Sequence, residues 1–303
     1  MSGILTDQLL TLSDELDTID LYSWISKTPD ASGFEALAGI KGFGMTDQTN
    51  RWFEGAGNGA LYRSSRVLPR ILEIPIWARE ENREELNNLL SRLSRMLHPR
   101  DPRLPAVRLT FGLPGGQTWY LGVVRESGGD YVRGGTDSDN NTWFKSSLTL
   151  KAGNPYWTRS SAESFVVTED DSGRGLLPWL AKLELSFSGA FGEFTVNNPG
   201  DVPAKPLWIM HGPFTKVIMI NKAGRSLVWE GDINNATRLF IDVETSTVID
   251  STGLNRYNGL VDDPAPKFWN IDPGESKITV VLEGTSSETY ALCQWWPQRW
   301  AVI

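Results

Sequence analysis

The last third of the chain constrains the fold most strongly, because it consists of short strand-like segments separated by turn residues. Each segment is rich in β-branched and aromatic residues, and Gly, Pro, Asn or Asp lies between them. The segments are 206–210, 216–221, 226–230, 238–242, 247–250, 276–282 and 289–292. Short strands at regular spacing are typical of a β-sandwich or barrel. The sequence therefore predicts an antiparallel β-sandwich for this region.

The first half of the chain combines strand patterns with one helix pattern. Residues 79–98 place six apolar side chains at three- and four-residue steps, with glutamates in the first turns and arginines in the last. Pro99 ends this segment. Strand patterns cover 70–77, 106–111, 118–124 and 141–152, and the glycine-rich stretches 39–44 and 54–60 are predicted loops. We expect an α+β domain over residues 1–160, with the helix packed on a sheet, and the sandwich domain over 161–303.

Composition excludes several functional classes. The net charge of −8 argues against a nucleic-acid grip, which needs a basic face, and against binding to anionic lipid. The start of the sequence has no basic leader followed by an apolar stretch, and no window of about 18 apolar residues occurs, so we expect cytoplasmic synthesis and no membrane span. Thirteen tryptophans, roughly three times average usage, raise the odds of a buried assembly surface.

Few residues could carry out chemistry. The single cysteine, Cys293, lies on an apolar strand and is predicted to be a buried thiol. His98 ends the predicted helix, where it caps carbonyl groups, and His211 lies where a strand meets a turn. Neither histidine has zinc-ligand spacing, and one cysteine cannot complete a zinc site. We therefore assign no catalytic, cofactor-binding or metal-binding residue.

Acidic residues occur in groups that are typical of solvated loops and helix ends. A glycosidase needs two carboxylates that converge from separate elements, and none of these groups predicts that geometry. Asp137, Asp139 and Asn141 alternate as in a calcium loop, but the glycine and glutamate of that loop are missing. The other groups are Asp170–Asp171, Asp262–Asp263 and Glu80–Glu81 with Glu84–Glu85.

The tryptophans of the C-terminal half allow two interpretations. They could form a platform for sugars or for a partner protein, or they could fill a sandwich core. Trp208, Trp229 and Trp295 alternate with polar or small neighbours, which favours the core. Trp296 and Trp300, on either side of a polar tripeptide, are the better candidates for an exposed or interfacial surface. Trp269 belongs to the same set.

Several segments, in order along the chain, resemble the distal tail proteins of long-tailed (siphovirus-type) bacteriophages. Residues 152–157 resemble the Pro-aromatic-Trp exit from the first domain of that family, and 196–206 resemble its Asn-x-Gly entry to the second domain. Residues 241–248 resemble its Ile-Asp…Val segment, and 268–278 resemble its Pro-Gly turn and following strand. The resemblance spans nearly the whole chain.

The resemblance implies a mainly β protein, with an N-terminal split β-barrel that carries one long helix and a galectin-like sandwich after it. It also implies a structural virion protein and not an enzyme: a homohexameric ring at the tail tip that joins the tail tube protein to the baseplate hub or tail-associated protein. The tape measure protein is a further candidate partner. DNA would pass through a lumen lined by the N-terminal domains without specific binding, and the net negative charge suits such a lumen.

A carbohydrate-binding sandwich module or adhesin is the alternative function, and the tryptophans are its direct support. The resemblance argues against it in two ways. The His-Asn-Arg set with which galectins bind sugar is absent, so that Trp229-Glu230 stands isolated. The second domain also has no room for an inserted carbohydrate-binding module, which implies that another protein binds the receptor.

Overall fold

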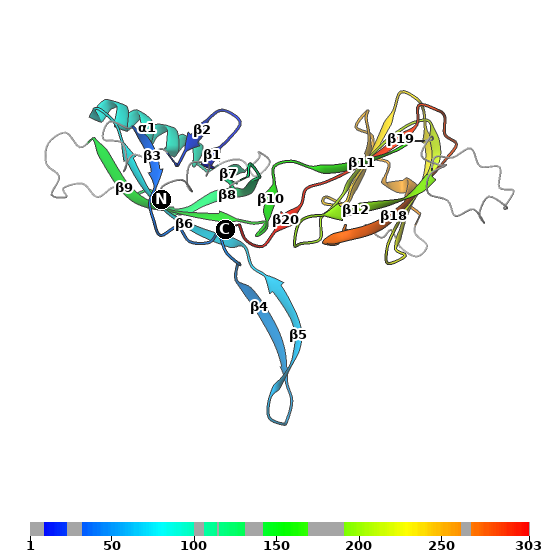
Figure 1. Ribbon diagram of the computed structural model, residues 1–303, viewed down its shortest axis with the longest axis horizontal. Coiled ribbons are helices and arrows are strands. Elements are labelled where there is room, and N and C mark those ends of the chain that lie inside the picture. Colours follow the sequence, from blue (N-terminus) through cyan, green and yellow to red (C-terminus); the bar gives the residue numbers. More distant parts are fainter. Residues whose placement is uncertain are drawn as a thin grey trace. The chain divides into compact units, whose positions relative to one another are not determined.

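The computed structural model describes residues 9–22, 32–99, 106–113, 115–130, 142–168, 191–261 and 268–302. The chain divides into two compact units (Figure 1). Unit 1 comprises residues 1–160 together with 299–303, and unit 2 comprises residues 161–298. Residues 299–303, which the strand pattern predicts to be part of the C-terminal domain, thus belong to unit 1.

Unit 1 is built on a nine-stranded sheet that curves into a nearly closed barrel. Its main path runs β2-β1-β7-β8-β9-β6-β3, and two short strands, β10 and β20, extend it beside β8. The bounds are β1 (Leu9–Ser13), β2 (Thr18–Asp20), β3 (Gly33–Ala36), β6 (Arg70–Arg79), β7 (Val107–Gly112), β8 (Thr118–Gly128), β9 (Trp143–Ala152), β10 (Trp157–Arg159) and β20 (Gln298–Arg299).

The curvature of this sheet comes from β8, which pairs with a different strand along each half of its length. Its first half forms a hairpin with β7, and its second half pairs with β9 across a register shift between Arg125 and Ser127. Bulges of this kind bend a strand and increase its twist. The two ends of the sheet then meet, since the amide of Ala36 donates to the carbonyl of Leu21 over 2.7 Å.

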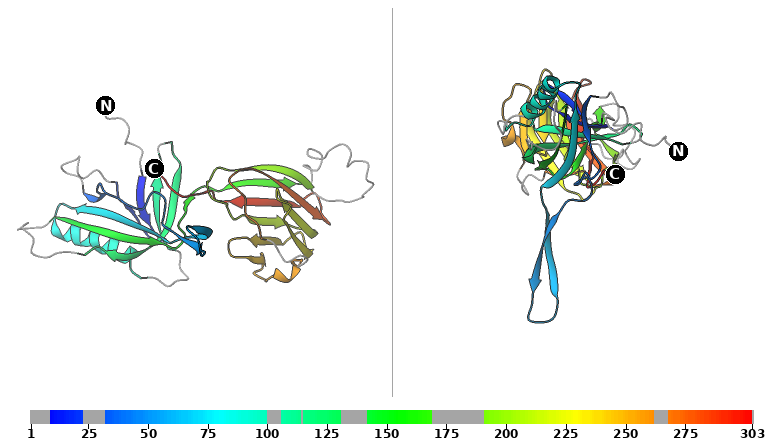
Figure 2. Two further views of the ribbon diagram at one scale, coloured as in Figure 1. Left: turned by 90° about the horizontal axis from the view of Figure 1, so that it is seen from below. Right: turned by 90° about the vertical axis from the view of Figure 1, so that its left-hand side faces the viewer.

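One α-helix occurs among the described residues, α1 (Arg83–Met96), and it covers the barrel sheet (Figure 2). It is shorter than the predicted range 79–98. Arg79 is still part of β6, where it pairs with Trp143, and the side chain of Asn82 caps the helix by accepting from the amide of Glu85 at 3.0 Å. A helix begins at its N-cap, so residues 79–81, which were predicted to be helical, instead complete the strand and the turn.

The predicted apolar stripe of α1 is confirmed. Leu86, Leu89, Leu93 and Met96 are buried and join the barrel core, in which alternate residues of β6 are fully buried. On the solvent side, Arg92 and Arg95 bind the carboxylate of Asp17 in the β1–β2 turn, and Arg92 does so through two hydrogen bonds. These bonds lower the pKa of Asp17.

Unit 2 is a sandwich of two antiparallel sheets, as the strand pattern predicts. The five-stranded sheet has the order β11-β19-β13-β16-β17 and the four-stranded sheet has the order β12-β18-β14-β15. The bounds are β11 (Glu163–Thr168), β12 (Phe191–Asn198), β13 (Leu207–His211), β14 (Phe214–Asn221), β15 (Ser226–Ile233), β16 (Arg238–Asp242), β17 (Thr247–Asp250), β18 (Gly274–Glu283) and β19 (Tyr290–Trp295).

The core of unit 2 lies between these sheets, and both contribute inward-facing side chains to it. Phe165 of the five-stranded sheet stacks on Phe194 of the four-stranded sheet, with a ring-centroid separation of 5.4 Å. A short 3-10 helix (Tyr257–Gly259) follows the edge strand β17. No helix in the described part of the chain is long and apolar enough to cross a membrane.

A buried carboxylate organises the turn after β17. Asp250, whose side chain is 1% exposed, accepts hydrogen bonds from the amides of Thr252 and Leu254 and forms an ion pair of 2.8 Å with Arg256. The hydroxyl of Thr252 also donates to Asp250, and these bonds hold the pKa of the carboxyl far below its usual range. The charged form of Asp250 therefore stabilises this end of the sandwich.

We predict that Asp250→Asn lowers the thermal unfolding midpoint of the protein at neutral pH. Because the pKa of Asp250 is lowered by folding, its contribution is present above the ordinary Asp pKa of about 3.9 and decreases as the pH falls below it. The difference in midpoint between wild type and variant should therefore narrow in acid, as calorimetry over a pH series would show. Asp232→Asn, at an exposed site, is the control, and a difference independent of pH would contradict the prediction.

Candidate assembly surface

Local contacts account for both histidines that the sequence singled out. His98 is exposed after α1, and its Nδ1 lies 2.9 Å from the carbonyl oxygen of Pro99. His211 ends β13, where its ring stacks on Tyr290 at a centroid separation of 5.1 Å and its Nδ1 lies 2.9 Å from the carbonyl oxygen of Gly212. Neither arrangement resembles a nucleophile–base pair.

The acidic groups behave as surface charges where the structure describes them. Glu84 and Glu85 occupy the first turn of α1, and burial, with repulsion from Glu85 and Glu81, raises the pKa of Glu80. Within the described ranges, no cluster of three His, Cys, Asp or Glu side chains could hold a metal ion. Three of the predicted acidic groups lie outside the described residues: Asp137, Asp139 and Asn141; Asp170 and Asp171; and Asp262 and Asp263.

Cys293 and most of the singled-out tryptophans belong to the core of unit 2. Cys293 is fully buried, as predicted, and burial raises the pKa of its thiol well above the ordinary value. Trp296 and Trp300 are half-buried. The remaining members of the set are 3% exposed or less: Trp208, Trp229, Trp269 and Trp295. No platform of exposed tryptophans therefore forms among the described residues of unit 2.

The most unusual surface is a hairpin that projects from unit 1, formed by β4 (Gln48–Glu54) and β5 (Ala60–Val67), which we call the arm (Figure 1). Every residue of β4 and all but the last of β5 are exposed. The two strands form a sheet of their own, and the outer edge of each has no partner strand in the described part of the chain. Isolated two-stranded hairpins are at best marginally stable in water, and free edges are templates for another chain.

Large apolar side chains occupy both faces of the arm near its tip. Trp52 lies opposite Tyr62 on one face, with ring centroids 5.4 Å apart, and Phe53 lies opposite Leu61 on the other. Their exposed fractions are 56%, 56%, 59% and 73%, respectively. Apolar side chains on both faces cannot be buried by folding the arm back onto one surface, because one face would remain in water. The arm is thus a surface that only an oligomer or a partner can cover fully.

The base of the arm is held by a buried arginine. Arg70, the first residue of β6, is 1% exposed and donates all its hydrogen bonds to backbone carbonyls. Its Nη1 binds the carbonyls of Gly42 and Gly44 before the arm, its Nε binds that of Pro155 at 2.7 Å, and its Nη2 binds that of Trp300. One guanidinium therefore joins three segments that are remote in sequence.

We call this set of hydrogen bonds from Arg70 the clasp, and two further features stabilise the same region. Gly42 has a φ of +93°, and a Cβ there would lie 2.2 Å from the carbonyl oxygen of Ile71, so only glycine allows the loop to approach β6 so closely. The returning C-terminal residues also pack onto unit 1, since Arg299 lies over the ring of Trp119 and the amide of Val302 donates to the carbonyl of Phe43. The last residues thus help to fix the loop that leads into the arm.

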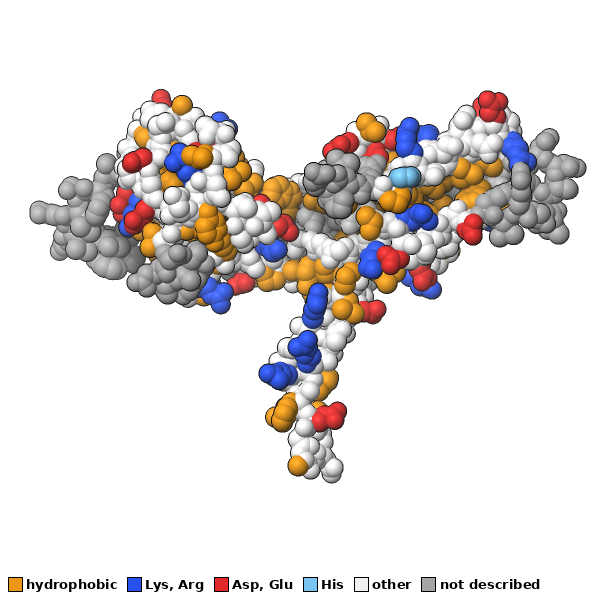
Figure 3. Space-filling model, turned by 180° about the vertical axis from the view of Figure 1, so that it is seen from behind, with side chains coloured by type: hydrophobic (Ala, Val, Ile, Leu, Met, Phe, Trp, Pro, Cys, Tyr) orange, Lys and Arg blue, Asp and Glu red, His pale blue; other side chains and the backbone are white. Residues whose placement is uncertain are grey.

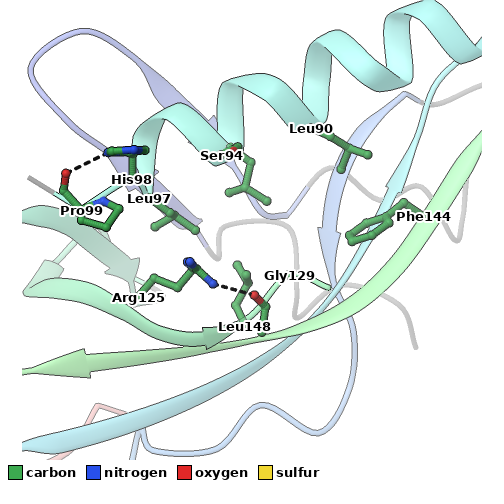
Figure 4. Close-up of a pocket in the computed structure, with 11 residues that line it drawn as sticks. Leu90, Ser94, Leu97, His98, Pro99, Arg125, Gly129, Phe144 and Leu148 are labelled. Atoms are coloured by element: carbon green, nitrogen blue, oxygen red, sulfur yellow. Dashed lines mark hydrogen bonds between the residues drawn. The ribbon is translucent and has the colours of Figure 1, made fainter. Parts of the chain in front are cut away.

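A cavity of about 350 Å³ lies between α1 and the second half of β8 (Figure 4). Its walls are mainly apolar and include Leu93, Leu97, Phe144 and Leu148. Arg125 lines it too, with Nη1 donating to the carbonyl of Gly128 over 3.0 Å. The described lining residues hold one guanidinium and one imidazole but no carboxylate, so they form no acid–base pair for catalysis.

Comparison with known proteins identifies the fold. No protein family model and no curated protein sequence matches the chain. The structure of the SPP1 Dit (gp 19.1) protein, titled a paradigm of the hub adsorption apparatus in phages that infect Gram-positive bacteria, matches with a TM-score of 0.63 and 15% identity over 95% of this chain and 98% of that one. A chain of the phage P2 baseplate, activated with Ca, matches with a TM-score of 0.55 and 11% identity over 97% of this chain and 99% of that one.

The fold is that of a distal tail protein. The fold predicted from the sequence is thereby confirmed, and the residues behind the resemblance have structural roles within it. Asn198 is buried and donates through Nδ2 to the carbonyls of Val202 and Ile271, so the entry segment of unit 2 is tied to the 268–278 segment. Asp242 accepts from the amide of Glu244 and the hydroxyl of Thr245 and shapes the β16–β17 turn. These residues position the strands and turns around them.

Sequence reasoning missed the arm. Residues 54–60 were interpreted as a glycine-rich loop, which is correct for the tip, but the flanking strands were not predicted. They lack the polar–apolar alternation of a half-buried strand because both of their faces are exposed. The available signal was the pairing of aromatic and apolar residues on each side of the loop, Trp52-Phe53 and Leu61-Tyr62.

We predict that Arg70→Met destabilises the protein by about 3 kcal/mol or more, because buried carbonyls that lose their donor each cost about 1–3 kcal/mol. Urea unfolding would measure the change. Arg225→Met, at an exposed turn, is the control and should change stability by less than about 0.5 kcal/mol. A destabilisation of Arg70→Met no larger than that of the control would contradict the role of the clasp.

Proposed function

We propose that this chain is a structural virion protein that forms a hexameric ring at the tip of a long phage tail. The ring would join the tail tube protein to the baseplate hub or tail-associated protein, with the tape measure protein as a further neighbour, and DNA would pass through its lumen. The proposal extends the likeness in fold to the SPP1 Dit protein and the P2 baseplate chain. A galectin-like fold for the sandwich of unit 2 is part of the same proposal.

The arm is the observation that supports assembly. It offers two free strand edges and apolar side chains on both faces, so a neighbouring copy could pair with each edge. Contacts in which one edge of a copy meets the opposite edge of the next are heterologous, and they close into a ring when the rotation between copies allows it. Burial of one large apolar side chain contributes about 1.5–3 kcal/mol, so a few per interface suffice to favour assembly.

The carbohydrate-binding alternative loses its support in the structure. It depended on tryptophans that could stack on sugars, and four of them, Trp208, Trp229, Trp269 and Trp295, are buried in the sandwich core, whereas Trp296 and Trp300 are half-buried. Trp229, the isolated echo of the galectin site, is 2% exposed, and its indole nitrogen donates to the carbonyl of Arg256 over 2.9 Å. A sugar cannot stack on a ring whose faces are packed inside the protein.

We predict that the double variant Trp52→Ser/Leu61→Ser prevents ring formation while leaving the unfolding midpoint nearly unchanged, because both side chains are exposed in the single copy. Light scattering after size-exclusion chromatography should give six times the chain mass of 33.8 kDa for the wild type and a smaller species for the variant. Negative-stain images should show rings with a central hole only for the wild type.

The matched control is Leu254→Ser/Tyr257→Ser, which removes two exposed apolar side chains from unit 2. This control should form rings like the wild type. Rings of normal mass from the Trp52/Leu61 variant would show that the arm tip is not an assembly contact. A wild-type protein that stays a monomer at every concentration would contradict self-assembly of the purified chain.

A further inference from the structure

The arm carries a charge opposite to that of the whole chain. The chain has a net charge of −8, but the two strands of the arm contain three arginines, Arg51, Arg63 and Arg66, and one acidic residue, Glu54, which gives them a net charge of +2. Figure 3 shows these basic side chains along the arm, with apolar groups towards its tip. The net charge of the sequence argued against a basic face, and the structure gathers one locally on this hairpin.

The strand register places two of these arginines together. Arg66 lies opposite Thr49, and Arg51 lies opposite Ser64. Residues two apart on a strand share a face, so Arg51 and Arg66 project from the same face of the ribbon, at diagonal positions. Arg63 falls at the register shift that follows this pair. The three guanidinium groups therefore follow one stretch of the ribbon between its base and its aromatic tip.

None of these arginines is engaged in the ion pairs that the described residues of unit 1 form. Those pairs include Lys41–Glu73, Arg92–Asp17, Arg95–Asp17 and Lys151–Glu126. Exposed guanidinium groups without a carboxylate partner are suited to phosphate, because their planar donors match phosphate oxygens in pairs. All three positions are arginine and none is lysine, which favours directed contacts over diffuse charge.

We infer that the arm contacts the sugar-phosphate backbone of double-stranded DNA through Arg51, Arg63 and Arg66, without reading its sequence. A two-stranded ribbon is narrow enough to lie against a DNA groove, and backbone contacts from arginine fix position without selecting bases. The inference rests on the proposed tail-tip function, because that position is where the arm would meet the DNA of the virion. It adds a ligand to a surface that the proposed function uses for assembly.

The expected contact is weak and strongly dependent on salt. Three phosphate contacts give a slope of about −2.7 for the logarithm of the binding constant against the logarithm of salt concentration, so a fourfold increase in salt reduces affinity about 40-fold. Electrostatic binding of this kind lets a protein slide along DNA. A contact that guides DNA is thus compatible with the free passage that the proposed function requires.

The test compares Arg51→Ser/Arg66→Ser with wild type and with Lys222→Ser/Arg225→Ser. The control also removes two positive charges, but from the exposed β14–β15 turn of unit 2. The probe is a fluorescein-labelled duplex of mixed sequence, about 20 base pairs long, with anisotropy measured between about 50 and 200 mM NaCl. Light scattering on the same samples gives the mass of each protein in parallel.

We expect the wild type and the control to bind the duplex equally, and the arm variant to bind at least about tenfold more weakly, with a salt slope smaller by about two. The mass of the arm variant should equal that of the wild type.

Equal affinity for the arm variant and the wild type, or no binding by the wild type, would overturn the inference and leave ring assembly untouched. An arm variant that loses its oligomeric mass would assign the arginines to subunit contacts, which also overturns the inference. Duplex binding by a wild-type protein that forms no ring would instead count against the proposed function.

Discussion

The buried guanidinium of Arg70 is the interaction on which the architecture of unit 1 depends most. A buried charge is costly unless its donors are satisfied, and here carbonyls from the loop before the arm, from the β9–β10 connection and from the C-terminal return satisfy them. Removing the cation would leave those carbonyls without a donor. The same group therefore anchors the base of the arm and gives the last residues of the chain a fixed place in the first unit.

The arm, whose base Arg70 holds, is a separate sheet of two strands with exposed side chains on both faces. Elsewhere in the protein, apolar side chains alternate with polar ones and are covered, either in the barrel under α1 or between the sheets of the sandwich. On the arm, apolar side chains point to both faces, and neither outer edge has a partner strand among the residues that the structure describes. Natural proteins protect exposed edges of this kind unless the edge is used for association. Assembly is therefore the simplest explanation for a feature that lowers the stability of the isolated chain.

The sequence predicts those strands and helices that have one buried face, because burial of one face imposes a regular spacing on their apolar residues. The sandwich strands and the apolar stripe of α1 each have one buried face, so their side chains repeat at steps of two or of three and four. β16 and β17 match the predicted ranges 238–242 and 247–250. The start of α1 was placed too early because the glutamates before Arg83 resemble a first turn, whereas the capping hydrogen bond of Asn82 decides where the helix begins.

The assembly surface and the return of the chain could not be predicted in this way. An element that is exposed on both faces has no period, so the arm left only the aromatic pairs beside a glycine-rich loop. The return of residues 299–303 to unit 1 depends on a hydrogen bond between Arg70 and Trp300, which are 230 residues apart, and no local pattern encodes it. A net charge summed over the chain likewise hides three arginines that the fold gathers on one hairpin.

Amide hydrogen exchange along β4 and β5, measured across a wide concentration series of the wild-type protein, tests most directly whether the arm is completed by other copies. If neighbouring strands pair with its free edges, the outward-facing amides of the arm will exchange rapidly in the dilute single copy and become protected when the protein assembles. Amides of the arm that exchange equally fast in the assembled protein would show that the edges stay open to water, and would contradict assembly through the arm.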